Sequence, residues 1–138
     1  MNKFFSPSPI ALDTIIAILR IVIGLLLIYH GHEIFRPEIM KTYFDWDPFK
    51  TSFGKFIVYV GKGSELVAGI FLLLGLLTRV EAVVALGTFL YITFFVGQGR
   101  FWYEDQHPFM FALFSVLFIF SGPGKWSLDA SIFNKSEE

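Results

Sequence analysis

The chain has 138 residues, of which 54% are hydrophobic and 17% charged; it has no cysteine and a formal net charge of −1. A water-soluble domain of this size needs more polar surface, the lack of cysteine excludes thiolate chemistry and cysteine-ligated iron–sulfur centres, and the scattered basic residues exclude a nucleic-acid-binding surface. We therefore interpret the sequence as an integral membrane protein with a single domain over residues 1–138.

The first predicted helix covers approximately residues 10–30, an apolar block of near-spanning length. Pro7 and Pro9 precede the block and suit a helix entry. A removed signal peptide is the alternative, but no small-x-small cleavage site follows and three more apolar blocks do. We expect a retained membrane span.

Residues 33–55 form the longest segment between apolar blocks, and they mix charged side chains with aromatic ones. This mixture is typical of a segment that lies at the lipid headgroups. An ordinary solvated loop is the alternative.

Three further helices are predicted over approximately residues 56–77, 80–97 and 106–121. The second and third are separated by so few residues that they must form a tight antiparallel hairpin. The fourth ends at a strong stop signal, Gly122-Pro123-Gly124. The predicted fold is all-α: an integral membrane four-helix bundle in a lipid bilayer, with a longer loop or interfacial segment between helices 1 and 2.

Arg20 and Glu65 each lie inside an apolar block. An ionised side chain near the bilayer centre costs about 2.5–3.5 kcal/mol even on lenient scales, so it normally faces a protein interior and has a partner. Counting along the helices at about 1.5 Å per residue places both at similar depth and predicts an ion pair between them. Each shares a helix face with small residues, Gly24 and Gly69 among them. The pair either belongs to a functional site or joins the helices as purely structural glue.

A second polar group is predicted where the helices meet the 33–55 segment, and it includes every histidine of the chain: His30, His32, Glu33, Glu104, Asp105 and His107. Imidazoles beside carboxylates can ligate a metal, shuttle protons or bind a quinone head group. The spacing matches no strong metal signature, so we predict no metal site. Ordinary placement of polar residues at a membrane interface is the alternative.

Three motifs carry a family resemblance. They are Leu19-Arg20-Ile21-Val22-Ile23-Gly24 with Tyr29-His30-Gly31, then Glu65-Leu66-Val67-Ala68-Gly69 leading to Leu77-Thr78-Arg79, and finally Gly122-Pro123-Gly124-Lys125-Trp126. In this order they resemble the DoxX family of small four-helix bacterial membrane proteins. The resemblance implies a multi-pass protein of the bacterial cytoplasmic (inner) membrane with cytoplasmic termini. It also implies a role in quinone-linked respiratory redox chemistry beside a redox partner protein.

The leading functional hypothesis is a quinone-binding subunit without a metal centre of its own, and whether it is itself an enzyme stays open. Glu65 and His30 would exchange protons with the head group, and Arg20 would hold Glu65 ionised. The candidate ligand-binding residues are Gly24, Tyr29, Lys62, Gly69 and His107. The alternative is a non-catalytic membrane scaffold or small-solute carrier that contains a structural intramembrane ion pair.

Overall fold

The computed structural model describes residues 6–133, which fold into helices without any strand in that range. This confirms the all-α prediction. The long helices are α1 (Leu12–Gly31), α3 (Gly54–Leu74), α4 (Thr78–Tyr91), its π-helical continuation η4 (Ile92–Val96) and α5 (Gln106–Ser121). The short ones are η2 (His32–Phe35), α2 (Pro37–Phe44), η3 (Asp47–Phe49) and α6 (Leu128–Phe133).

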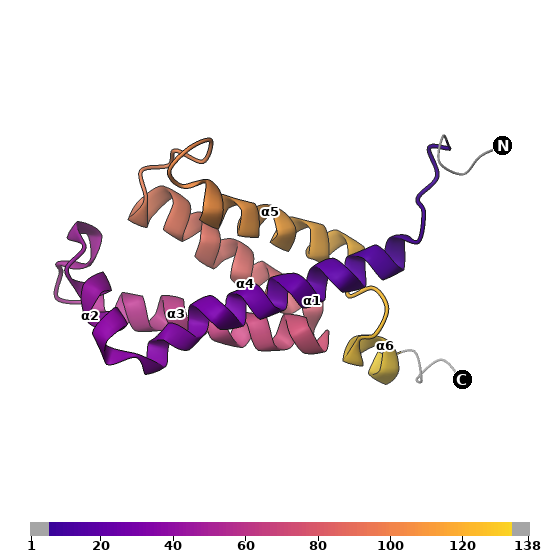
Figure 1. Ribbon diagram of the computed structural model, residues 1–138, viewed down its shortest axis with the longest axis horizontal. Helices are drawn as coiled ribbons and strands as arrows, with labels where there is room; N and C mark the ends of the chain where they lie inside the picture. Colours follow the sequence, from indigo (N-terminus) through magenta and orange to yellow (C-terminus); the bar gives the residue numbers. More distant parts are fainter. Residues whose placement is uncertain (1–5, 134–138) are drawn as a thin grey trace.

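The long helices form an elongated bundle in which α1 packs mainly against α3, and α4 against α5 (Figure 1). The turn between α3 and α4 joins the two pairs. The α2 segment and the loop before α5 lie at one end of the bundle, and α6 lies at the other. We call these the α2 end and the α6 end.

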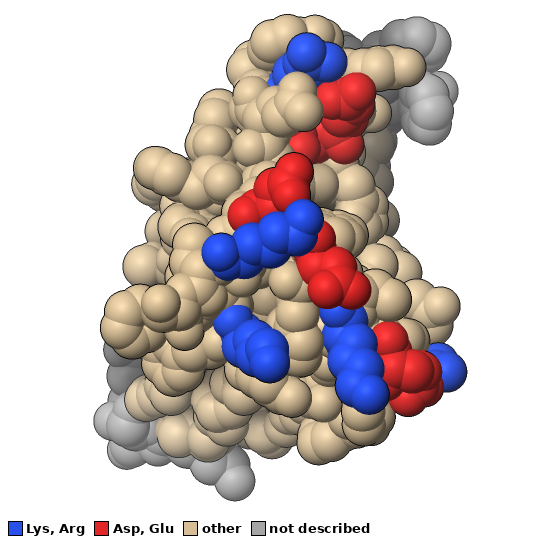
Figure 2. All heavy atoms as spheres, turned by 90° about the vertical axis from the view of Figure 1, so that its left-hand side faces the viewer, with Lys and Arg blue, Asp and Glu red and all other residues tan. Residues whose placement is uncertain are grey.

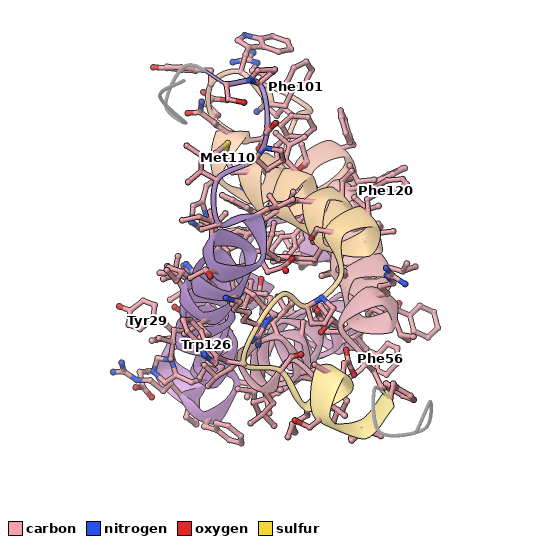
Figure 3. The ribbon with its side chains drawn as sticks, turned by 90° about the vertical axis from the view of Figure 1, so that its right-hand side faces the viewer. Tyr29, Phe56, Phe101, Met110, Phe120 and Trp126 are labelled. Carbon is pink, nitrogen blue, oxygen red and sulfur yellow. The ribbon has the colours of Figure 1, made fainter. Side chains whose placement is uncertain are left out.

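Three helical stretches are long and apolar enough to cross a membrane: Leu12–Phe35, Gly54–Leu74 and Thr78–Val96. The fourth, α5, is equally apolar but has 16 residues, or about 24 Å of helix. Many large apolar side chains point outward from the bundle, as Figure 3 shows for Tyr29, Phe56 and Phe120. Such a surface is unsuited to water and suited to lipid.

The contact between α1 and α3 depends on glycine. A Cβ atom added at Gly24 would lie 2.7 Å from the backbone nitrogen of Leu73, and one added at Gly69 would lie 2.6 Å from that of Ile28. The two backbones therefore approach more closely than any side chain would allow, as expected for helices packed in a membrane.

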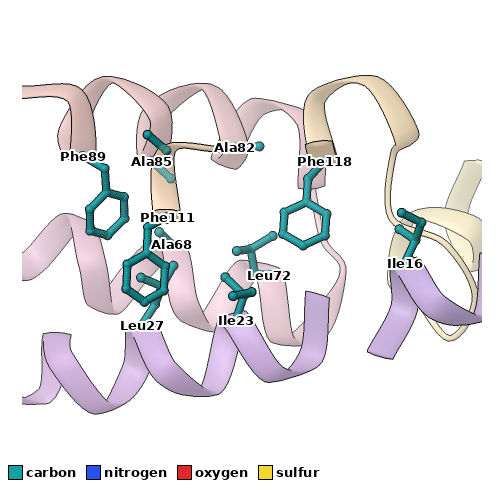
Figure 4. Packing of buried hydrophobic residues seen from close by; sticks show 11 residues of the cluster. Ile16, Ile23, Leu27, Ala68, Leu72, Ala82, Ala85, Phe89, Phe111 and Phe118 are labelled. Carbon is teal, nitrogen blue, oxygen red and sulfur yellow. The ribbon is translucent and has the colours of Figure 1, made fainter. Parts of the chain in front are cut away.

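Apolar side chains from all four long helices fill the bundle interior (Figure 4). The rings of Phe89 on α4 and Phe111 on α5 are stacked with their centroids 4.9 Å apart. Nearer the α6 end, Phe118 of α5 is fully buried and points toward Leu72 and Ile23. This packing fixes how the α4–α5 pair sits on the α1–α3 pair.

Arg20 is fully buried and holds the α6 end of the bundle together. Its guanidinium donates hydrogen bonds to the carbonyl oxygens of Leu72 and Leu73 at the end of α3, at 2.5 and 2.9 Å. It also donates to three carbonyls of the segment that follows α5, those of Pro123, Lys125 and Trp126, at 2.8, 3.2 and 2.8 Å. We call this arrangement the Arg20 clasp.

The predicted ion pair between Arg20 and Glu65 is therefore wrong. Gly31 lies against Leu66, whereas Arg20 lies level with the end of α3. At 1.5 Å per residue, Arg20 is about 16 Å along α1 from the level of Glu65. The prediction failed because it assumed that the end of α1 and the beginning of α3 lie at the same depth in the membrane.

Asp129 of α6 caps the N-terminus of α4, although the two lie about 50 residues apart in the sequence. Its two carboxylate oxygens accept hydrogen bonds from the backbone N–H groups of Leu77 and Thr78, at 2.7 and 2.9 Å. The first N–H groups of a helix have no partner inside it, and Leu77, which has φ of 48°, is held here in the left-handed region. The cap thus stabilises both the helix end and a strained turn.

Replacing Asp129 with alanine should lower the free energy of unfolding by about 1–2 kcal/mol, the usual effect of losing a helix cap. Unfolding by sodium dodecyl sulfate in mixed micelles, followed by tryptophan fluorescence, measures this loss. Asp129→Asn keeps one acceptor oxygen and should lose less. Equal stability of wild type and Asp129→Ala would show that α6 does not cap α4.

Residues 33–55, predicted as an interfacial segment or loop, are largely helical. Met40 of α2, Phe49 of η3 and Val58 of α3 form a small apolar cluster of their own. Figure 2 shows acidic and basic side chains in a band across this end of the molecule. The segment is therefore packed onto α3 on one side and polar on the other, which agrees with a position at the headgroup level.

Candidate functional site

A cavity of about 650 Å³ opens at the α2 end of the bundle, between α1, α3, α4 and α5. Aromatic and aliphatic side chains make up most of its wall, including Trp46, Phe56, Ile92 and Phe111. The polar side chains in the wall include His30, Tyr43, Lys62, Glu65 and His107. We call it the polar cavity. Its size and mixed lining are those of a small-molecule site.

Lys62 and Glu65 form a buried ion pair one turn apart on α3. The Lys62 ammonium lies 3.1 Å from a carboxylate oxygen of Glu65 and 2.8 Å from one of Glu33. It also lies 4.7 Å from the centroid of the Tyr43 ring. Residues i and i+3 share a helix face, so the sequence spacing itself produces the Lys62–Glu65 pair.

Tyr43 extends this network to α2, since its hydroxyl donates a hydrogen bond of 2.7 Å to Glu33. Burial raises the pKa of Tyr43, and the hydrogen bond to the Glu33 carboxylate raises it further. The phenol therefore stays a neutral donor. Together, Tyr43, Glu33, Lys62 and Glu65 form a continuous chain of polar contacts, and all of these residues except Glu33 line the cavity.

His30 of α1 and His107 of α5 meet in the wall of the same cavity. Their ring centroids are 5.1 Å apart, and both rings pack edge-on against Phe111. His32 instead turns away, because its Nδ1 is paired with the carbonyl of Tyr29. As the helical spacing predicts, the two histidines of α1 and η2 do not share a face. Two imidazoles thus line the same cavity as a lysine–carboxylate pair.

The structure brings together four of the predicted site residues, His30, Lys62, Glu65 and His107, at the polar cavity. The other four do not line it. Arg20 forms the clasp at the far end, and Gly24 and Gly69 make the α1–α3 contact. Tyr29 is 65% exposed on the outer surface.

Tyr43 was not predicted as a site residue. Its position depends on α2 folding back over α3, which no local motif indicates. Glu81 was also missed; it is buried on α4 although it lies in an apolar sequence block. The same rule that singled out Glu65, a lone acid within a predicted span, could have found it.

Among residues 6–133, no group of three or more His, Asp or Glu side chains is arranged to hold a metal ion. The polar cavity offers hydrogen-bond donors and one paired carboxylate instead. Such groups can bind a polar ring or head group and exchange protons with it.

The fold and the cavity define a multi-pass helical membrane protein with a polar site near one end of its bundle. The DoxX family model matches residues 15–98, so the chain belongs to the DoxX family. It is also similar to an uncharacterized protein of Haemophilus influenzae, with 28% identity over 127 residues that cover 87% of this chain and 92% of the relative. No solved structure matches significantly.

Proposed function

We propose that this protein binds a membrane quinone in the polar cavity and serves as a quinone-binding subunit of a redox assembly in the bacterial inner membrane. The observation that carries the proposal is the combination of a cavity of about 650 Å³, largely apolar walls and imidazole and ammonium donors. A quinone has the matching parts: an apolar ring and tail, and two carbonyl oxygens that accept hydrogen bonds.

The polar residues suit the two ends of such a head group. His30 and His107 can donate to one carbonyl oxygen, and Lys62 to the other. Reduction of a quinone adds electrons and then protons, and Glu65, His30 and His107 are the groups able to hold those protons. The residues present therefore fit the ligand. The electrons would come from or go to a partner protein.

The family resemblance supports the same proposal, since it implies quinone-linked respiratory chemistry, an inner-membrane location and cytoplasmic termini. On that orientation the α6 end would face the cytoplasm and the polar cavity the opposite side. Quinone would enter from the bilayer, because the cavity lies among helices whose outer surfaces are apolar.

The test compares quinone content after purification into lipid nanodiscs that contain quinone, using mass spectrometry. We expect wild type to retain about one quinone per binding site and Glu65→Gln to lose most of it. Glu65→Gln should fold, because Lys62 keeps its contact with Glu33. Asp47→Asn, at an exposed acid that does not itself line the cavity, is the matched control and should retain quinone. Equal, background-level quinone in all three would contradict the proposal.

A membrane scaffold or carrier is the second candidate, and one observation favours it: Glu33, Lys62 and Glu65 already satisfy one another. If the network is only structural, replacing Lys62 and Glu65 together with methionine and glutamine should preserve function. Loss of quinone binding in a stable double variant would count against the scaffold.

A further inference from the structure

A smaller cavity of about 380 Å³ lies in the groove between α3 and α4, and it shares Ser64 with the wall of the polar cavity. Its outer rim is formed by Val67, Val80 and Val84, each more than half exposed on the lipid-facing surface. Among the described residues that line this cavity, Glu81 is the only one with an ionisable side chain. A carboxyl group thus borders a groove that is otherwise open to lipid.

The Glu81 side chain is deeply buried and unpartnered. The residue is 6% exposed, and both carboxyl oxygens are buried without a hydrogen-bond partner in the described part of the chain. The hydroxyl oxygen of Thr78, one turn earlier on the same helix face, is in the same condition. Polar atoms in this state are rare and point to a bound species.

The charged groups of the neighbouring helices are engaged elsewhere. On α3, Lys55 lies over the ring of Phe44, and Lys62 pairs with Glu65. On α4, the Arg79 guanidinium lies beside Gly122, and α5 contains His107 but no Asp, Glu, Lys or Arg. On α6, Asp129 accepts from the α4 backbone. Within residues 6–133, no cation pairs with Glu81.

An ionised carboxylate buried in this way is strongly unfavourable, and such a group is usually neutralised instead. A metal cation is a poor candidate for the neutralising charge, because hard cations take six or more oxygen ligands and the only side-chain oxygens among the described residues that line the groove are those of Glu81 and Ser64. Hydrogen bonds from a hydroxyl or a water would satisfy the oxygens without neutralising the charge. A proton removes the charge, which is the larger part of the cost of burial.

We propose that Glu81 is a proton-binding acid inside the membrane, held neutral in the groove between α3 and α4 and reached from the lipid phase. The proposal goes beyond quinone binding, because Glu81 does not line the polar cavity and its proton does not depend on a ligand there. The protein would thus contain two distinct titratable sites, an ion-paired one on α3 and a neutral one on α4.

Dicyclohexylcarbodiimide tests this directly, since it partitions into lipid and reacts with undissociated carboxyl groups. The acid O–H adds across one C=N bond, and the product rearranges to a stable N-acylurea that peptide mass spectrometry locates. In wild-type protein in nanodiscs at neutral pH, we expect the adduct on Glu81 and not on Glu65, which is ion-paired with Lys62. Raising the pH should reduce the adduct.

A water-soluble carbodiimide with an added amine is the matched control. It should modify exposed acids such as Glu38 and spare Glu81. The same protein unfolded in acidified organic solvent controls for the reagent. Failure of the lipid-soluble reagent to modify Glu81, or modification of Glu81 by the water-soluble one as readily as Glu38, would overturn the proposal. Both readouts use wild-type protein, so neither depends on quinone binding or on the folding of a variant.

Infrared spectroscopy gives an independent readout. Wild type at neutral pH should show the carbonyl stretch of a neutral carboxylic acid, and Glu81→Gln should lose that band while Glu65→Gln retains it. A spectrum without the band in wild type would contradict the proposal.

Discussion

Replacing Arg20 with methionine is expected to lower the free energy of unfolding by about 3–5 kcal/mol, the range seen when one partner of a buried charged interaction is removed. The guanidinium serves five carbonyl oxygens in two separate segments. Without it, buried acceptors at the end of α3 and after α5 lose their donor. Unfolding by sodium dodecyl sulfate in mixed micelles measures the difference.

Arg20→Lys tests the contribution of the positive charge separately from that of the guanidinium's shape. Lysine keeps the positive charge, but a single nitrogen cannot reach both segments as the planar guanidinium does. We expect the free energy of unfolding of Arg20→Lys to lie between those of wild type and Arg20→Met. Arg36→Met is the control, because Arg36 is half exposed and pairs with an exposed glutamate, and surface pairs contribute little. If Arg20→Met were as stable as Arg36→Met, the clasp would not hold the α6 end together.

The second large effect is expected at the α1–α3 contact. In Gly24→Ala the new Cβ would lie 2.7 Å from the Leu73 nitrogen and 2.9 Å from the Gly69 oxygen, both backbone atoms. The helices must separate to accommodate it, and overpacking of this kind costs about 1–3 kcal/mol. The same unfolding measurement applies, and Gly69→Ala should behave similarly.

Gly87→Ala is the matched control, because a Cβ at Gly87 on α4 would meet nothing within 4 Å. There, alanine should stabilise the helix by about 0.5–1 kcal/mol through its higher helix propensity. The two substitutions are chemically identical and should have opposite signs. A stabilising Gly24→Ala would mean that α1 and α3 are not in close backbone contact.

Much of the fold could be predicted because the apolar blocks are long and their boundaries are marked by glycine and proline. When η4 is counted with α4, the helix ends differ from the predicted ones by up to three residues, most at the end of α3. There Gly75, with φ of 64°, ends the helix in a left-handed turn before Leu76 and Leu77. The prediction included Leu76 and Leu77 in the helix because they are apolar, although Gly75 already indicated the end of the helix.

The candidate site was predicted less completely, because its partners are distant in sequence. His30 and His107 could be placed at the same end of the bundle, and the structure brings their rings together. The partners of Arg20 could not be predicted, because backbone carbonyls carry no sequence signature. The contact of Lys62 with Tyr43 depends on α2 folding over α3, which follows from apolar contacts between residues 33–55 and Val58 of α3.

Photolabelling with an azido-substituted quinone tests the central claim most directly, since it asks whether the polar cavity binds quinone. Wild-type protein in nanodiscs would be irradiated with the probe, with and without excess unlabelled quinone, and the labelled peptides identified by mass spectrometry. The account predicts saturable labelling, suppressed by the competitor, on peptides that carry His30, Lys62 or His107. Labelling that is not suppressed, or that is confined to the outer lipid-facing surface, would contradict it.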